Sequence, residues 1–131
     1  MTMPHERFRS ITRLPEMLAV AVADERLDTR LRARAELLLK RYPEEAAFRR
    51  LIETRQQGLP SDFADRLDEA ISWLQDLRTA DQLSDDLMQW RRWILRHFPE
   101  PWDVRSQRKA VGEPNSTLWS SIDHWIKPER E

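Results

Sequence analysis

The sequence of 131 residues contains no cysteine and only 2 glycines, and these shortages exclude several classes of protein. Without cysteine there is no disulfide framework, no thiolate nucleophile and no cysteine-ligated zinc or iron–sulfur centre. With two glycines, Gly-rich phosphate-binding loops and chains of tight hairpins are nearly excluded, because both need backbone positions with positive φ. A membrane span needs about 18 consecutive apolar residues, and no apolar run approaches that length. We therefore expect a soluble protein.

The distribution of charge is uneven although the totals nearly cancel, with 22 basic and 23 acidic side chains. Residues 1–60 carry a net +3, residues 61–104 a net −5, and the last 27 residues a net +1. Halves of opposite charge favour contact with each other, within one chain or between two copies. Neither half is basic enough to indicate nucleic-acid binding by charge alone.

The compartment is inferred from the start of the chain and from its composition. The polar residues 1–10 include an acidic side chain and resemble neither a secretory signal nor a transit peptide. Together with the lack of cysteine, this start favours a cytoplasmic location. Arginine outnumbers lysine 19 to 3, as is typical of a GC-rich bacterial genome.

Apolar residues recur at helical spacing along most of the chain, so we expect an all-α protein of five to six helices. The first helix is predicted to be capped by Thr2 and to kink or break near Leu14, before Pro15. Later helices are predicted over 28–42, over 44–57 with Gly58 as its stop, from the cap Ser61, and from the cap Ser84. A short helix over 101–111 and a last amphipathic helix follow, the latter containing Leu118, Trp119, Ile122, Trp125 and Ile126.

An internal repeat becomes visible when the sequence is displaced by 56 positions, because residues 24–44 then align with residues 80–100 without a gap. Identical pairs include Leu27 with Leu83 and Pro43 with Pro99. Each unit is predicted to be a helical hairpin that cannot bury its apolar face alone, so the two should pack together. We expect units at 1–58 and 61–100, with a C-terminal helical arm at 101–131, in one compact domain. The alternative is a chance match between two amphipathic helices with similar caps.

Two segments resemble a family of small uncharacterised bacterial proteins, which open TMPxERTR and carry an LLRHYP-like segment at the end of a second helix. The matching positions are 2–9 and 37–43, and residues 94–99 (ILRHFP) repeat the second motif. Phe8 replaces the usual threonine, and the tail beyond Trp102 has no counterpart in that family. The resemblance implies a small helical bacterial protein. It assigns no activity and no catalytic residues.

Candidate catalytic and metal-binding patterns are weak. The three histidines form no HxxxH or HExxH pair, and the acidic residues 81, 85 and 86 lack the tight glycine turn of an oxygen-ligand loop. Ser121 and His124 share one helical face, but no strained nucleophile turn surrounds them. We therefore predict no enzymatic activity, no metal and no cofactor.

The tryptophans point to binding of another protein. All six lie between Trp73 and Trp125, and Trp73 and Trp90 fall in phase with the core stripes. Tryptophan and arginine are enriched at the energetic centres of protein interfaces. We predict a protein-binding adaptor, inhibitor or regulator, alone or as a homodimer, whose partner-binding residues are Arg91, Arg92, Trp93, Trp102, Trp119 and Trp125. The alternative for the terminal tryptophans is that the last helix folds back and they fill the core.

A second hypothesis is a nucleic-acid-associated regulator that uses an arginine row on the second helix. Arg30, Arg34 and Arg41 fall along one helical face, and guanidinium groups suit phosphates. Acidic residues are interleaved with this row, however, and no helix-turn-helix signature is convincing. A solvated or partner-facing row is therefore the favoured interpretation.

Overall fold

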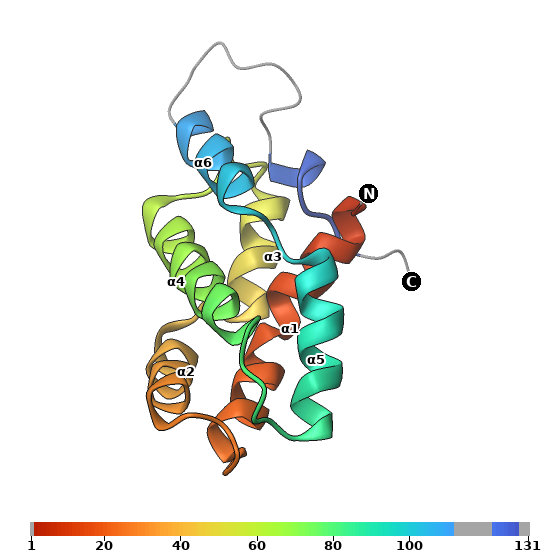
Figure 1. Ribbon diagram of the computed structural model, residues 1–131. Coiled ribbons are helices and arrows are strands. Elements are labelled where there is room, and N and C mark those ends of the chain that lie inside the picture. Colours follow the sequence, from red (N-terminus) through yellow and green to blue (C-terminus); the bar gives the residue numbers. More distant parts are fainter. Residues whose placement is uncertain (1, 112–121, 129–131) are drawn as a thin grey trace.

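The computed structural model describes residues 2–111 and 122–128, which form a bundle of six α-helices and one 3₁₀ turn (Figure 1). The described residues contain no β-strand, which confirms the all-α prediction, and none of their helices has the length and apolarity of a membrane span. The elements are α1 (Pro4–Ala23), α2 (Thr29–Arg41), α3 (Glu45–Glu53), α4 (Ser61–Leu77), α5 (Asp85–His97), α6 (Pro101–Ala110) and η2 (Ile122–His124).

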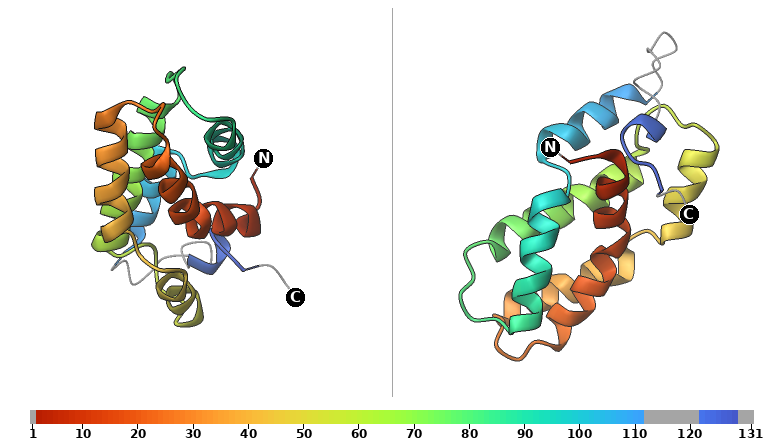
Figure 2. Two further views of the ribbon diagram at one scale, coloured as in Figure 1. Left: turned by 90° about the horizontal axis from the view of Figure 1, so that it is seen from below. Right: turned by 90° about the vertical axis from the view of Figure 1, so that its right-hand side faces the viewer.

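The helix α1 lies at the centre of the packing, with α2 on one side and α5 on the other. The helix α4 packs against α2 and α6, and more lightly against α5 (Figure 2). One apolar core joins these helices, and its fully buried side chains include Ile11, Leu67, Trp73 and Ile94. Burial of such side chains contributes about 1.5–3 kcal/mol each. The packing therefore holds α1 and α5 in a fixed relation at one side of the molecule.

The helix bounds repeat at the displacement of 56 residues. The bounds of α2 map onto those of α5 without an offset, and the caps Asp28 and Ser84 both accept a hydrogen bond from the first turn of their helix. The starts of α3 and α6 correspond, and α1 and α4 agree within two residues. The packing of α1 on α5 is also the counterpart of the packing of α4 on α2. These bounds favour grouping α6 with the second unit, as α3 is grouped with the first.

Pro15 does not break α1, which runs without interruption over Pro4–Ala23, so of the predicted kink or break near Leu14 the break is wrong. Proline has no N–H, and the carbonyl of Ile11, four residues earlier, therefore lacks its helical donor. The hydroxyl of Tyr42, the C-cap residue of α2, donates to this carbonyl at 2.6 Å. Burial raises the pKa of Tyr42 well above its ordinary value, so the hydroxyl keeps its proton and remains a donor. A side chain from α2 thus supplies the hydrogen bond that the proline removes.

Three predicted helix ends are also wrong. Met3, not Thr2, is the N-cap of α1, because the Met3 N–H donates to Glu6 Oε1 at 2.9 Å while the Thr2 hydroxyl donates to the Arg96 carbonyl. The helix α3 ends at Glu53, well before residue 57, because Arg55 adopts the left-handed conformation with φ 51. Ser61 is the first residue of α4 rather than its cap.

The predicted last helix is only partly within the described residues, since Leu118 and Trp119 lie outside them. Residues 122–128 contain the single 3₁₀ turn η2 and no α-helix, which corrects the prediction for this part. The Ile122 N–H donates to the Gln56 carbonyl at 2.8 Å, and the Lys127 N–H to the Pro4 carbonyl at 3.2 Å. The segment therefore joins the end of α3 to the start of α1.

Candidate functional site

The structure separates the five residues of the predicted partner-binding surface that it describes. The Arg91 guanidinium points into the bundle and donates to the carbonyls of Leu77 and Ala80 at 3.0 and 2.7 Å. Trp125 is only 8% exposed, as the core alternative for it predicts, and the Arg7 guanidinium lies 5.5 Å from its ring centroid. Both side chains are thus engaged within the chain.

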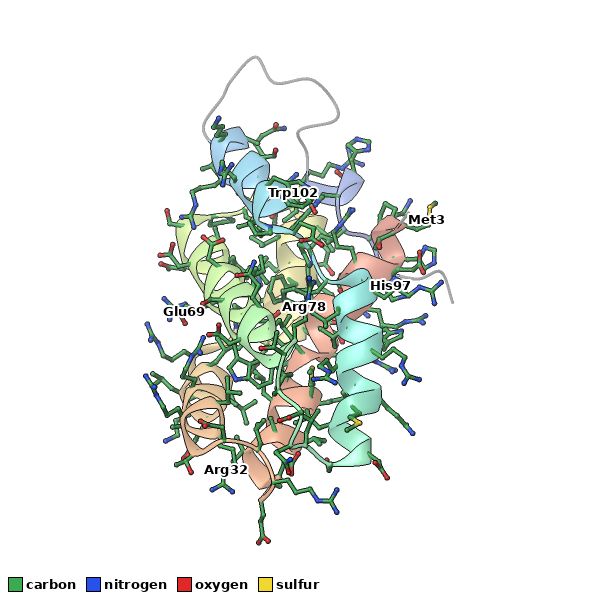
Figure 3. All side chains as sticks on the ribbon, viewed as in Figure 1. Met3, Arg32, Glu69, Arg78, His97 and Trp102 are labelled. Carbon is green, nitrogen blue, oxygen red and sulfur yellow. The ribbon has the colours of Figure 1, made fainter. Side chains whose placement is uncertain are left out.

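The other residues of that prediction lie on two helices or outside the described residues. Trp102 is 62% exposed in the first turn of α6, where Figure 3 labels it, and Trp119 lies outside the described residues. Arg92 is exposed and Trp93 half-buried on α5. Of the predicted surface, the structure therefore leaves Arg92 and Trp93 together on an accessible part of one helix.

A hollow of about 280 Å³ lies between α1 and α5, and we call it the tryptophan groove. Trp90 and Trp93 meet edge to face inside it, with ring centroids 6.1 Å apart and planes at 79°. Both rings are half-buried, so part of each lies against the core and part remains open to solvent. The groove is lined by Arg13, Asp86, Gln89, Trp90 and Trp93.

The order of side chains along α5 explains why this groove is aromatic. Leu87 and Ile94 are fully buried against the bundle, which fixes the rotation of the helix about its axis. Residues three apart share one side of a helix, so Trp90 and Trp93 both lie beside α1. Arg13, on the exposed side of α1, completes the wall. The chain therefore presents aromatic surface next to a guanidinium.

One end of α5 is held against the first turn of α1 by polar contacts. His97 Nδ1 lies 3.5 Å from Glu6 Oε2, and the His97 ring is 5.7 Å from that of Trp93; Figure 3 shows His97 at this junction. The hydrogen bond from the Met3 N–H lowers the pKa of Glu6 below its ordinary value, and the neighbouring His97 adds to this effect. Glu6 thus remains ionised at this junction at neutral pH.

Of the residues that line the tryptophan groove, sequence reasoning found Trp93, assigned Trp90 to the core, and missed Arg13, Asp86 and Gln89. Arg92, also predicted, is exposed on α5 but does not line the groove. The three-residue spacing of Trp90 and Trp93 was a signal that both share one face. Helical spacing also places Arg91 inward, four residues after Leu87 and three before Ile94. Arg13 leaves no such local signal, because its place in the groove depends on how α1 packs against α5.

A second groove, of about 260 Å³, lies between α2 and α4. At the displacement of 56, its lining residues Arg34, Leu37 and Glu69 correspond to Trp90, Trp93 and Arg13. The two grooves occupy equivalent positions but differ in chemistry, since the second has no solvent-facing tryptophan pair.

The predicted nucleic-acid row lies partly in this second groove. Arg34 pairs with Asp76 at 2.5 Å, and Arg41 lies 3.8 Å from Glu69, which Figure 3 shows on α4. Arg30 has no ion pair to a described residue and lines a larger hollow that Asp76 and Asp81 also line. Carboxylates on α4 therefore compensate most of the positive charge that a phosphate backbone would require.

No three histidine, aspartate or glutamate side chains converge as a possible metal site within residues 2–111 and 122–128. Compared with models of protein families, with curated proteins and with solved structures, the chain has no match. The resemblance to small bacterial proteins therefore stays a prediction.

Proposed function

We propose that this chain is a non-enzymatic protein-binding module and that the tryptophan groove is its binding surface. The observation that carries the proposal is the edge-to-face pair of Trp90 and Trp93, half-buried in an open hollow. The core tryptophan Trp73 provides the contrast, since it is 1% exposed and its Nε1–H donates to the Leu31 carbonyl at 2.9 Å. The groove tryptophans keep apolar surface in contact with water, which a partner could bury.

The open form and the composition of the groove favour a protein over a small ligand. Pockets for drug-sized ligands usually measure about 300–1,000 Å³ and enclose most of the ligand, whereas this hollow of about 280 Å³ lies near the lower end of that range and is open to solvent. Tryptophan and arginine side chains dominate the energetic centres of protein interfaces, and truncating one such anchor typically costs about 2 kcal/mol or more. Trp93, which lines the groove together with Arg13, has the residue type and the partial exposure of such an anchor.

The nucleic-acid hypothesis has less support. Two of its three arginines, Arg34 and Arg41, are paired with acidic side chains of α4, and only Arg30 lacks such a pair among the described residues. Phosphate binding would have to break those pairs or tolerate the nearby carboxylates.

Affinity capture tests the proposal. Tagged wild-type protein, Trp93→Ala and the matched control Leu37→Ala would each be incubated with an extract of the cells that make this protein. Leu37 is the counterpart of Trp93 in the second groove. We expect wild type and Leu37→Ala to capture the same protein, and Trp93→Ala to lose roughly 30-fold or more in affinity, the equivalent of about 2 kcal/mol.

Circular dichroism and thermal unfolding would show that all three proteins are folded. Equal capture by a folded Trp93→Ala variant would contradict the proposal, as would the absence of any protein captured by the wild type in preference to a tag-only control.

A further inference from the structure

The outward side of α5 carries a stripe of four residues that no described element covers. Asp86, Gln89 and Arg96 are exposed and Trp93 is half-buried, whereas the opposite side of the helix is buried in the core. The packing partners of α5 are α1 and, more lightly, α4 (Figure 2). We call these four residues the α5 stripe.

The spacing of the α5 stripe is that of a helix–helix seam. Its members are separated by three, four and three residues, which corresponds to alternating a and d positions of a heptad. Residues with this spacing form one nearly straight line along a helix, and the 13 residues of α5 span about 20 Å. The stripe therefore has the shape needed to pack lengthwise against another helix.

The charge along α5 changes sign from its first turn to its last. The first turn of α5 is acidic, with Asp85 and Asp86, and the last turn is basic, with Arg96 and His97. A partner helix running antiparallel and carrying the same charges would place its basic end against the acidic end of α5. A parallel copy would instead place like charges together at both ends. The pattern is thus complementary to itself in one orientation only.

We propose that a second copy of this chain covers the α5 stripe, with the two α5 helices packed antiparallel about a two-fold axis. In this arrangement Asp86 of each copy faces Arg96 of the other, and Gln89 faces Trp93. This is the a-to-d pairing of an antiparallel seam. Every contact occurs twice, as two-fold symmetry requires. Arg13, which borders the same groove on α1, extends the interface beyond one helix.

A foreign partner of one charge sign fits this stripe less well. An acidic segment would be attracted to Arg92 and Arg96 but repelled by Asp85 and Asp86, and a basic segment would meet the reverse. A second copy satisfies both ends at once. Because exposed ion pairs are individually weak, the open ring surface of Trp93 at the centre of the seam supplies most of the affinity, and the charges fix the direction.

This inference rests on the proposed function, because it names the partner that covers the tryptophan groove. Light scattering would measure the mass in solution from about 1 µM to 1 mM. We expect the wild type to reach the mass of two chains, and Trp93→Ala to keep the mass of one. Arg96→Asp and Asp86→Arg, each alone, should also remain single chains, because each creates two like-charge contacts.

A mixture provides the decisive measurement. When Arg96→Asp and Asp86→Arg are combined in equal amounts, both positions of the mixed pair bring opposite charges together, so the mass of two chains should return. The matched control is Lys40→Asp, the same charge reversal at the position of α2 equivalent to Arg96. This control should leave the dimer of the wild type unchanged.

Specific results would overturn the inference. A wild type that keeps the mass of one chain at all concentrations refutes it, and so does a pair of charge variants that each dimerise like the wild type. If the wild type is a single chain but Trp93→Ala loses a captured protein, this inference fails while the proposed function stands. If the dimer behaves as described and Trp93→Ala captures the same foreign proteins as wild type, the groove binds a second copy of this chain, and only the assignment of a foreign partner to the groove fails.

Discussion

Replacing Tyr42 with phenylalanine would remove the hydroxyl that supports α1 at Pro15 and leave the packed ring almost unchanged. The Tyr42 hydroxyl donates to the Ile11 carbonyl at 2.6 Å, and both residues are buried. Because residue 15 is a proline and supplies no N–H, removing the hydroxyl leaves the Ile11 carbonyl without a hydrogen-bond donor. Leaving a buried polar group unsatisfied costs about 1–3 kcal/mol. We expect Tyr42→Phe to lower the free energy of unfolding by this amount.

A double-mutant cycle with Pro15→Ala tests the physical reason as well as the size. Alanine restores an N–H at residue 15, which can donate to the Ile11 carbonyl in the usual helical way. In that background Tyr42→Phe should cost about 0.5 kcal/mol or less, so the two substitutions should be coupled by about 0.5 kcal/mol or more. Urea unfolding followed by tryptophan fluorescence and circular dichroism would measure each variant.

Thr12→Val is the matched control, because the Thr12 hydroxyl donates to the Phe8 carbonyl at 2.9 Å within the same helix. That carbonyl also has the N–H of residue 12 as its helical donor. Loss of this hydroxyl should therefore change the stability by about 0.5 kcal/mol or less. An equal cost of Tyr42→Phe in the presence and absence of Pro15 would refute the reasoning.

Two further stability measurements test other contacts of the fold. Gly58→Ala should cost about 2 kcal/mol or more, because Gly58 has φ 80 and an added Cβ would lie 2.1 Å from the Gln107 carbonyl oxygen; an unchanged urea midpoint would contradict this. Asp24→Asn should cost about 1–2 kcal/mol at pH 7, since the Asp24 carboxylate accepts the N–H groups of Ser84 and Arg26. Burial alone would raise the pKa of Asp24, but these hydrogen bonds outweigh it and lower the pKa. The contribution is therefore full above the unfolded pKa of about 3.9 and is lost as the pH falls through the lower folded value; a pH-independent difference between wild type and variant would contradict this.

Local chemistry made α2 and α5 predictable, because their caps act within one turn. Asp28 and Ser84 accept hydrogen bonds from the first turns of their own helices, and the apolar stripes behind them set the inward faces. The predicted break at Pro15 was wrong because the hydrogen bond to the Ile11 carbonyl comes from Tyr42, at the end of another helix, and not from a neighbouring residue. The end of α3 failed because it depends on the backbone of Arg55, a residue type that rarely adopts positive φ.

The candidate site was predictable only where it depends on one helix. Trp93 stood out by composition, and the three-residue spacing could have added Trp90. Arg13 reaches the groove only through the packing of α1 on α5, which joins segments far apart in the sequence. A single sequence contains no signal for such a contact.

The two repeat units have corresponding helix bounds, but some side chains at equivalent positions differ. Tyr42 corresponds to Phe98, and each is 7% exposed, while Pro15 corresponds to Ile71. Ile71 has an N–H, so the carbonyl four residues earlier in α4 needs no outside donor, and the second unit has no hydroxyl at that position. The hydroxyl is thus present only in the unit that contains the proline, as expected if it serves the backbone.

The side chains of the two grooves also differ, but no matching difference in helix bounds accompanies this change. The second groove has Arg34, Leu37 and Glu69 where the tryptophan groove has Trp90, Trp93 and Arg13. The bounds of α2 and α5 nevertheless coincide at the displacement of 56. Partly exposed tryptophan side chains are not needed to form this helix pair, since α2 and α4 pack in the equivalent way with Leu37 and Arg34 at those positions. A difference that the fold does not require, and that leaves aromatic surface open to solvent, supports the proposal that the tryptophan groove binds another molecule.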